Sequence, residues 1–280
     1  MNCHLLIPGL FWRSNDEAYL EPDLPALRTL LARATTAQDS VPVMEEWLCR
    51  TFAVDRQQDW PVAALTLIAD GGSPGNDYWL RADPVHLRVD SGQLLLADSR
   101  AIGITRDEAN QLTQAINSHF NNAGLVFQAC RPERWYLRLE KPPQLRTRAL
   151  AEVAGKNIDE FLPVGADSVY WHGVCNEIQM VLHNHPVNEA REAAGNPPVN
   201  SVWLWGGGRR PMITRKPFVH VWTNECLSKG LALASGANIS SLQQNAQAWL
   251  AQSRAPGVHL VVLDSLRDAA QYRDMERWMV

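Results

Sequence analysis

Residues 176–210 read NEIQMVLHNHPVNEAREAAGNPPVNSVWLWGGGRR, and this stretch decides the fold. Four of its side chains recur with helical spacing and predict the buried face of a helix: Ile178, Val181, Leu182 and His185. A second stripe with the same spacing is polar: His172, Asn176, Gln179 and His183. Pro186 cannot continue the hydrogen-bond ladder, so the helix is expected to end near His185.

The second part of the stretch predicts a short helix, a turn and a strand. Asn188 is placed to cap the short helix, and Gly195 can close it in the left-handed conformation. The sequence NPP then forces a turn, and VNSVWLW has the pattern of a strand. Three glycines, Gly206–Gly208, follow this strand and are expected to form a loop.

A glycine loop next to arginines is typical of a site for anions. Without side chains, the backbone N–H groups of Gly206–Gly208 are open to a phosphate or carboxylate, and Arg209 and Arg210 add forked donors. The alternative is a flexible turn followed by two solvated arginines. The polar helix stripe, together with Asn188 and Arg191, favours the ligand site.

Composition limits the function classes. The 280 residues carry 26 basic and 30 acidic side chains, and the net charge of −4 gives no reason to expect nucleic-acid binding. Five scattered cysteines without a C-x-x-C motif suit reduced thiols in a cytosol rather than a disulfide framework or a zinc site. No apolar run approaches the roughly 18 residues of a membrane span. We therefore expect a cytoplasmic protein without a membrane partner.

The N-terminal third predicts a strand followed by helices. Residues 3–7 have the pattern of a short buried strand, and residues 24–34 and 43–52 that of two amphipathic helices. Residues 62–69 are apolar throughout, so periodicity does not decide between helix and strand. Residues 70–77 are expected to form a loop.

A compact α+β unit is predicted next. Residues 78–90 and 93–98 are two strands around a turn, and residues 125–130 and 134–139 are two more. Between the pairs, Thr105 and Glu108 form a capping box that opens a helix through about residue 120. Arg81, Asp83 and His86 lie on the first strand, where they either face a ligand or form a solvated strand face.

The remainder of the chain predicts alternating strands and helices. Residues 140–167 are a polar connection with prolines near both ends. After the opening stretch come a strand at 218–223, helices at 225–235 and 241–252, a strand at 257–264 and a closing helix. The expected organisation is an α/β core from residues 1–75 and 168–280, an inserted β-β-α-β-β domain at 76–140 and a connecting loop at 141–167.

Catalytic motifs are not visible. His183 and His185 point to opposite sides of a helix and cannot readily share one metal ion. His183 is the better ligand-facing candidate, and His185 is more simply a core histidine. The sequence has no G-x-S-x-G, P-loop or G-x-G-x-x-G motif.

The string from Asn176 to Gly208 resembles the signature of the RpfE-type bacterial regulatory protein family. That family is similar to the archaeal-type cofactor-independent phosphoglycerate mutases. They share an Asn-Glu helix, a His-Pro-x-Asn break, an Arg, a Pro-x-Asn turn and a strand that runs into glycines. The segments YWLRADPVH and TRDEANQL resemble the start and the helix of the mutases' inserted substrate domain.

The resemblance implies an alkaline-phosphatase-like α/β fold, a parallel sheet flanked by helices, with an inserted α+β domain. It also implies that a phosphorylated small molecule binds near the opening stretch. Together with the residues of the inserted domain, the expected anion-binding set is Asn176, Glu177, His183, Asn188, Arg191, Asn200, Gly206, Gly207, Gly208, Arg209, Arg81, Asp83 and His86.

Departures from the mutase pattern favour the loss of catalysis. The mutases need an Asp after the first strand, where this chain has Pro8 and Gly9, and a Ser or Thr nucleophile. Asp264 remains after the last strand, but no His follows it at the expected distance. We therefore expect no catalytic residue, no metal and no cofactor.

The leading hypothesis is a degenerate, mutase-like protein with a regulatory or sensing role that binds an anionic metabolite. An active metal-dependent phosphoglycerate mutase or phosphatase with non-standard ligands is one alternative. The other is a structural or interaction module with a protein partner.

Overall fold

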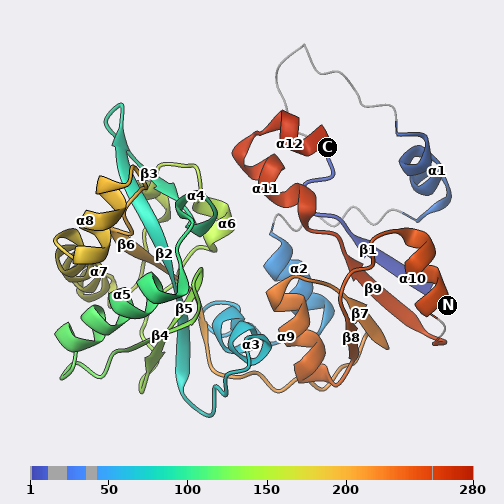
Figure 1. The fold of residues 1–280 in the computed structure, drawn as a ribbon. Coiled ribbons are helices and arrows are strands. Elements are labelled where there is room, and N and C mark those ends of the chain that lie inside the picture. The colour runs from blue at the N-terminus through green and yellow to red at the C-terminus, as the bar shows by residue number, and fades with distance from the viewer. Residues whose placement is uncertain (1, 12–23, 36–42, 254, 280) are drawn as a thin grey trace.

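The structure is a computed structural model that describes residues 2–11, 24–35, 43–253 and 255–279. Two β-sheets lie side by side with helices around and between them (Figure 1). One sheet is parallel and is built from both ends of the chain, and the other is antiparallel and is built from its middle. The fold is therefore mixed α/β.

The parallel sheet has the strand order β1-β9-β7-β8. Its strands are β1 (Asn2–Leu6), β7 (His220–Trp222), β8 (Asn238–Ser240) and β9 (Val258–Val262). Helices α2 (Met44–Thr51) and α9 (Cys226–Ser235) share a hydrophobic core with one face of this sheet. Helix α10 (Ala246–Gln252) lies against the other face, where Trp249 packs on Trp222 and His259. The expected parallel sheet with helices on both faces is confirmed.

Three further helices belong to this half: α1 (Pro25–Arg33), α11 (Ser265–Tyr272) and α12 (Met275–Met279). Asp264 directly precedes α11, so its predicted place after the last strand is confirmed. The helix expected over 241–252 begins only at Ala246, where the Asn245 side chain accepts from the N–H of Ala248 as the cap.

The antiparallel sheet is organised around the long strand β2 (Tyr78–Asp90). One side of β2 pairs first with β5 (Arg134–Leu139) and then with β3 (Gln93–Ala97), and the other side pairs with β6 (Ser201–Gly208). Strand β4 (Val126–Arg131) pairs with β5. The four strands predicted between residues 78 and 139 are confirmed.

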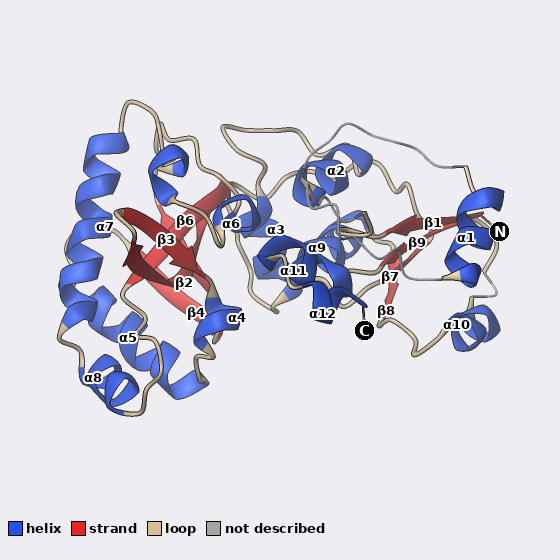
Figure 2. Cartoon of the chain, turned by 90° about the horizontal axis from the view of Figure 1, so that it is seen from above, coloured by secondary structure: helices blue, strands red, loops and turns tan. Residues whose placement is uncertain are grey.

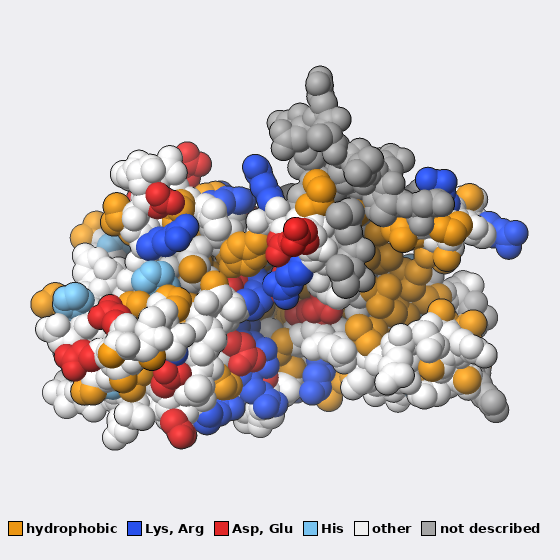
Figure 3. Space-filling view, turned by 45° about the horizontal axis from the view of Figure 1, so that its top comes forward, with side chains coloured by type: hydrophobic (Ala, Val, Ile, Leu, Met, Phe, Trp, Pro, Cys, Tyr) orange, Lys and Arg blue, Asp and Glu red, His pale blue; other side chains and the backbone are white. Residues whose placement is uncertain are grey.

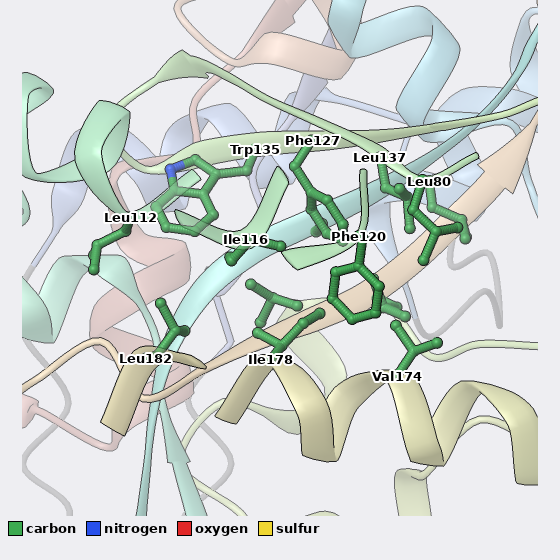
Figure 4. Close-up of a cluster of buried hydrophobic side chains, with 14 of the residues drawn as sticks. Leu80, Leu112, Ile116, Phe120, Phe127, Trp135, Leu137, Val174, Ile178 and Leu182 are labelled. Carbon is green, nitrogen blue, oxygen red and sulfur yellow. The ribbon is translucent and has the colours of Figure 1, made fainter. Parts of the chain in front are cut away.

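Helices α5 (Arg106–His119), α7 (Ser168–His183) and α8 (Pro186–Ala193) pack on the antiparallel sheet (Figure 2). Side chains from α5, such as Leu112 and Ile116, meet Ile178 and Leu182 of α7 over Trp135 of the sheet (Figure 4). Ile178 and Leu182 of the predicted apolar stripe are therefore on the buried face of α7, Val181 is partly buried there, and His185 lies beyond the end of the helix. A one-turn helix, α4 (Ser99–Ile102), connects β3 to α5.

Helix α3 (Val62–Ala69), whose type the sequence left open, lies where the two halves meet. Seven of its eight residues are buried, because α9 packs on it from one half and β2 and β6 from the other. At Gly230 of α9 an added Cβ would lie 2.1 Å from the carbonyl oxygen of Leu65. The halves are thus joined by close helix contact.

The connection at 140–167 contains two short helices, α6 (Leu150–Val153) and the 3-10 helix η1 (Ile158–Phe161). Val153 and Ile158 are buried in a core cluster that also includes Trp203 of β6 and Leu260 of β9. This cluster spans both sheets, so part of the predicted connecting loop at 141–167 packs into the core and forms two short helices.

The domain boundaries at 75, 140 and 168 stay a prediction. Strand β6 and helices α7 and α8, which that division assigned to the core domain, pair and pack with β2 and α5 in the antiparallel half. No helix in the described part of the chain is long and apolar enough to cross a membrane.

Candidate functional site

Asn188, which was predicted to cap helix α8, instead lies inside it and is buried. The cap is His185, whose Nδ1 accepts from the N–H of Val187. The Asn188 side chain donates to the carbonyl oxygens of Leu182 and Val199, both at 2.8 Å, and accepts from the N–H of Val199 at 2.9 Å. These bonds join the end of α7 to the strand that follows α8.

Arg191 is 4 % exposed and its guanidinium is surrounded by protein acceptors. Its Nε donates to the Pro197 oxygen at 2.9 Å, Nη2 to the Ile102 oxygen at 2.6 Å and Nη1 to the Glu108 carboxylate at 2.8 Å. Glu108 is the capping-box residue of α5, so Arg191 fastens α8 to α5.

Asn200 and His86 complete this group of side chains. The Asn200 amide accepts from the N–H of Leu87 at 2.7 Å and donates to its carbonyl oxygen at 2.8 Å. The Nδ1 of His86 lies 2.9 Å from the carbonyl oxygen of Pro198. The structure therefore brings Asn188, Arg191, Asn200 and His86 into one region, where all four hold the 186–200 segment in place.

Arg81 and Asp83 form a buried ion pair on β2. Nε and Nη2 of Arg81 lie 3.0 and 2.7 Å from Oδ1 of Asp83, and the other carboxylate oxygen accepts from the indole N–H of Trp205 at 2.7 Å. The guanidinium also faces the rings of Tyr136 and Trp205. Arg81 and Asp83 are buried, so they do not form a solvated strand face, and their predicted role toward a ligand stays a prediction.

The three glycines do not form a loop. Gly206–Gly208 are the last residues of strand β6 and are buried. An added Cβ would lie 2.9 Å from Val62 at Gly206, 2.5 Å from the Tyr78 hydroxyl at Gly207 and 2.5 Å from Pro61 at Gly208. The absence of side chains thus lets β6 approach α3 and β2 closely.

The remaining residues of the predicted set are scattered. Asn176, Glu177 and His183 are exposed on α7, and Glu177 pairs with His119 at 2.8 Å. The Arg209 guanidinium donates to backbone oxygens of Asn76 and Glu140. The anion-binding role of the set stays a prediction, and its members do not surround one cavity.

A cavity of about 150 Å³ lies between the two halves of the molecule. Its walls come from four segments that are distant in sequence, namely 43–46 at the start of α2, 56–62 before α3, 147–152 at α6, and 205–206 in β6. We call it the interlobe cleft. In the space-filling view, Lys and Arg side chains gather along the junction of the halves (Figure 3).

A chain of hydrogen bonds forms one wall of the interlobe cleft. The N–H of Gly206 donates to the hydroxyl of Thr147 at 3.1 Å, and this hydroxyl donates to the carboxylate of Asp59. The N–H of Thr147 also donates to Asp59, at 3.1 Å from Oδ2. Burial raises the pKa of Asp59, and the bonds from Thr147 oppose that rise.

The other carboxylates of the cleft also have protein partners. Glu45 pairs with Arg267 at 2.5 Å, Glu46 pairs with Arg50, and Glu152 accepts from the N–H of Ala149 at 3.0 Å. One oxygen of Glu45, Oε2, is buried without a hydrogen-bond partner. Glu45 and Glu46 are thus paired with arginines outside the cleft lining, whereas Glu152 accepts from a backbone N–H and Asp59 from Thr147.

Arg56 and Arg148 are the basic side chains that line the cleft, and both are exposed. Arg56 is exposed, with its guanidinium 5.7 Å from the centre of the Trp60 ring. The nearest carboxylate oxygen of Glu152 lies 3.8 Å from Arg148, whose side chain is 61 % exposed. Two guanidinium groups at the mouth of a cavity suit an anionic ligand.

Of the predicted anion-binding set, only Gly206 is among the residues that line this cleft, and its other walls were not predicted. Nothing in the local pattern connects Arg56 with Arg148, and only the fold brings their segments together. The general rule that ligands bind outside the carboxyl ends of parallel strands is the one signal that points toward this side of the molecule.

The carboxyl ends of the parallel strands do not offer a donor set for a pair of metal ions. The Glu225 carboxylate accepts from the N–H groups of Leu227 and Ser228 as the cap of α9. Gly9, where an Asp would be needed, packs so closely on α11 that an added Cβ would lie 2.7 Å from the Leu266 oxygen. Within the described residues, no group of three or more His, Cys, Asp or Glu side chains could hold a metal ion.

Comparison with known proteins agrees with the mutase resemblance. Residues 74–188 match the family model of 2,3-bisphosphoglycerate-independent phosphoglycerate mutase. The chain resembles these mutases. The mutase of that name from Methanosarcina barkeri is 27% identical over 155 residues, which are 53% of this chain and 39% of the relative. The one from Methanosarcina mazei is 38% identical over 63 residues, which are 22% of this chain and 16% of the relative.

The matched stretches thus span less than half of either relative. A solved protein from Pyrococcus horikoshii superposes on 99% of this chain and 76% of its own, with a TM-score of 0.52 and 17% identity. That likeness concerns the fold alone.

Proposed function

We propose that this protein is a mutase-like binding protein that holds a small phosphorylated or carboxylated metabolite in the interlobe cleft and serves a regulatory role. The observation that carries the proposal is the position of Arg56 and Arg148 at the cleft, where both side chains are exposed and Glu45 is paired with Arg267. The RpfE-type regulatory role and the alkaline-phosphatase-like ancestry of the fold belong to this proposal.

Metal-dependent phosphoryl transfer is not part of the proposal. The carboxylates of Glu45 and Glu225 are bonded to an arginine and to a helix N-terminus, and the place of the needed Asp is filled by tightly packed Gly9. The arrangement supports recognition of charge and shape without an ion to activate a nucleophile.

Isothermal titration with 3-phosphoglycerate, 2-phosphoglycerate and inorganic phosphate tests the proposal. Each charged hydrogen bond contributes about 1.5–3 kcal/mol, so the Arg56→Ala/Arg148→Ala variant is expected to bind at least about tenfold more weakly. The matched control is Arg33→Ala/Arg88→Ala, which removes the same charge from α1 and from the β2–β3 hairpin and keeps the affinity. Equal affinity of the cleft variant and the control contradicts the proposal.

An active mutase is the second candidate, because the curated relatives carry that name and the family model matches residues 74–188. Mutase and phosphatase assays with added Mn²⁺, Mg²⁺ or Zn²⁺ separate the two candidates. Metal-dependent turnover that is lost with the Glu45→Ala change would replace the binding proposal by the enzymatic one.

A further inference from the structure

One carboxylate oxygen of Glu45 is not used by the protein. Glu45 lies in the first turn of α2, is 6 % exposed and lines the interlobe cleft. Its Oε1 pairs with Arg267 at 2.5 Å, whereas its Oε2 is buried and has no hydrogen-bond partner among the described residues. Buried acceptors are normally paired, because an unpaired one destabilises the protein. An unpaired oxygen on a residue that lines a cavity therefore indicates a donor group on a ligand.

The other carboxylates of the cleft differ from Glu45 in this respect. Asp59 accepts from the N–H and the hydroxyl of Thr147, and Glu152 accepts from a backbone N–H. Glu46 pairs with an arginine one turn later in α2. Within the described residues, Glu45 is the only acidic side chain that has a buried oxygen without a partner. The position of the expected donor is thus specific to Glu45.

The lining of the cleft also carries both signs of charge. Two guanidinium groups and four carboxylates line it, from Arg56, Arg148, Glu45, Glu46, Asp59 and Glu152. A ligand with negative charge alone would pair with the two arginines and would leave Oε2 of Glu45 without a donor. A ligand that carries an ammonium group as well would serve both, and hydrogen bonds between charged groups are the stronger kind.

We propose that Oε2 of Glu45 accepts a hydrogen bond from an ammonium group, so that the interlobe cleft binds a small zwitterion, an amino acid with a second acidic group. This inference rests on the proposed function, since it places the acidic groups of the ligand at Arg56 and Arg148. Arg267 is a positioning residue, because its bond to Oε1 holds the carboxylate and leaves Oε2 to the ligand.

Isothermal titration of the wild-type chain with three matched compounds tests this inference. Phosphoserine, 3-phosphoglycerate and 3-(phosphonooxy)propionate share a carboxylate and a phosphate. On the same carbon they carry an ammonium group, a hydroxyl group and a hydrogen atom, respectively. Phosphoserine is expected to bind at least about tenfold more tightly than the propionate compound, and more tightly than 3-phosphoglycerate.

Glu45→Gln tests the role of the single oxygen. The amide keeps an oxygen for Arg267 and replaces Oε2 by an NH₂ group, which donates and cannot accept. Phosphoserine should lose its advantage in this variant, whereas the affinity for the propionate compound should not fall. The matched control is Glu189→Gln, which removes the same charge at an exposed position of α8 outside the cleft lining and keeps the preference for phosphoserine.

Circular dichroism shows whether Glu45→Gln folds, and the comparison on the wild type needs no variant. Equal affinity of the wild type for phosphoserine and the propionate compound overturns this inference, as does a folded Glu45→Gln protein that keeps the preference. Binding of 3-phosphoglycerate as tight as that of phosphoserine overturns the ammonium assignment in favour of a hydroxyl donor. In these cases the anion site at Arg56 and Arg148 stands. If none of the three compounds binds, the proposed function fails together with this inference.

Discussion

The segment around residues 186–208 and the interlobe cleft are both rich in polar side chains, but their groups are used differently. In the segment, Asn188 and Arg191 direct their hydrogen-bonding atoms at backbone and side-chain atoms of the protein. In the cleft, Arg56 and Arg148 keep their guanidinium groups exposed beside a cavity. Asn188 and Arg191 use their hydrogen-bonding groups within the protein and so stabilise the fold. The exposed guanidinium groups of Arg56 and Arg148 are available to a ligand.

Packing within the protein also explains why Gly206–Gly208 form the end of a strand and not the expected loop. A run of three glycines after a strand fits an anion loop, and it fits equally well a strand that must approach its neighbours without side chains. Gly207 lies so close to Tyr78, and Gly208 so close to Pro61, that the glycines serve close packing of the strand. Changes in the segment should therefore reduce stability, and changes in the cleft should reduce binding.

Among changes in the antiparallel half, the largest loss of stability is expected from breaking the buried ion pair of β2. Arg81→Met leaves Asp83 buried without its cation and is expected to lower the free energy of unfolding by about 3–5 kcal/mol. The double variant Arg81→Met/Asp83→Leu removes both charges and should be more stable than the single one. Urea unfolding measures both, and a single variant as stable as wild type would show that Arg81 is not a structural residue.

A smaller effect is expected at the glycines. In Gly207→Ala the new methyl group would lie 2.5 Å from the Tyr78 hydroxyl and 2.8 Å from Leu80, which should cost about 1–3 kcal/mol. The control is Gly173→Ala in helix α7, where no atom lies within 4 Å, and this change should stabilise by roughly 0.5–1 kcal/mol. Thermal unfolding that ranks the two variants in the opposite order contradicts the packing role.

The smallest effect is a pH dependence at the junction of the halves. Burial raises the pKa of Asp70, but hydrogen bonds from Arg134 and Tyr136 outweigh burial and hold the pKa below its ordinary value. The stabilisation is therefore present above about pH 4, the ordinary pKa of Asp, and is lost as the pH falls through the folded-state pKa.

Asp70→Asn removes this titrating group. The free energy of unfolding of the variant should fall less steeply than that of the wild type when the pH is lowered below about 4. Urea unfolding at a series of pH values gives the two slopes. Parallel slopes would mean that Asp70 has the same pKa in the folded and unfolded chain.

Local signals in the sequence predicted most of the elements. The capping box of Thr105 and Glu108 starts α5, and Gly236 closes α9 in the left-handed conformation. These features depend on residues that are close together in the chain, so they can be predicted from the sequence alone. Strands β2, β3, β4 and β5 were predictable for the same reason, since their alternation and turns are local.

The misses depend on distant partners. The role of Gly207 follows from Tyr78, more than 120 residues away, and that of Arg191 from Glu108 and Ile102, more than 80 residues away. Strand β1 was expected to be buried because its residues are apolar, but apolarity does not say whether a strand is central or at an edge. The cleft needs four separate segments, and no spacing within one of them indicates the others.

Hydrogen–deuterium exchange with and without saturating 3-phosphoglycerate tests the central claim most directly, because it reports where the ligand acts along the chain. The ligand should slow exchange in residues 56–62 and 147–152, which line the interlobe cleft. Residues 186–191, which do not line the cleft, should exchange at the same rate in both conditions. Protection confined to residues 186–200, with none at 56–62 or 147–152, would contradict the assignment of the ligand site to the cleft.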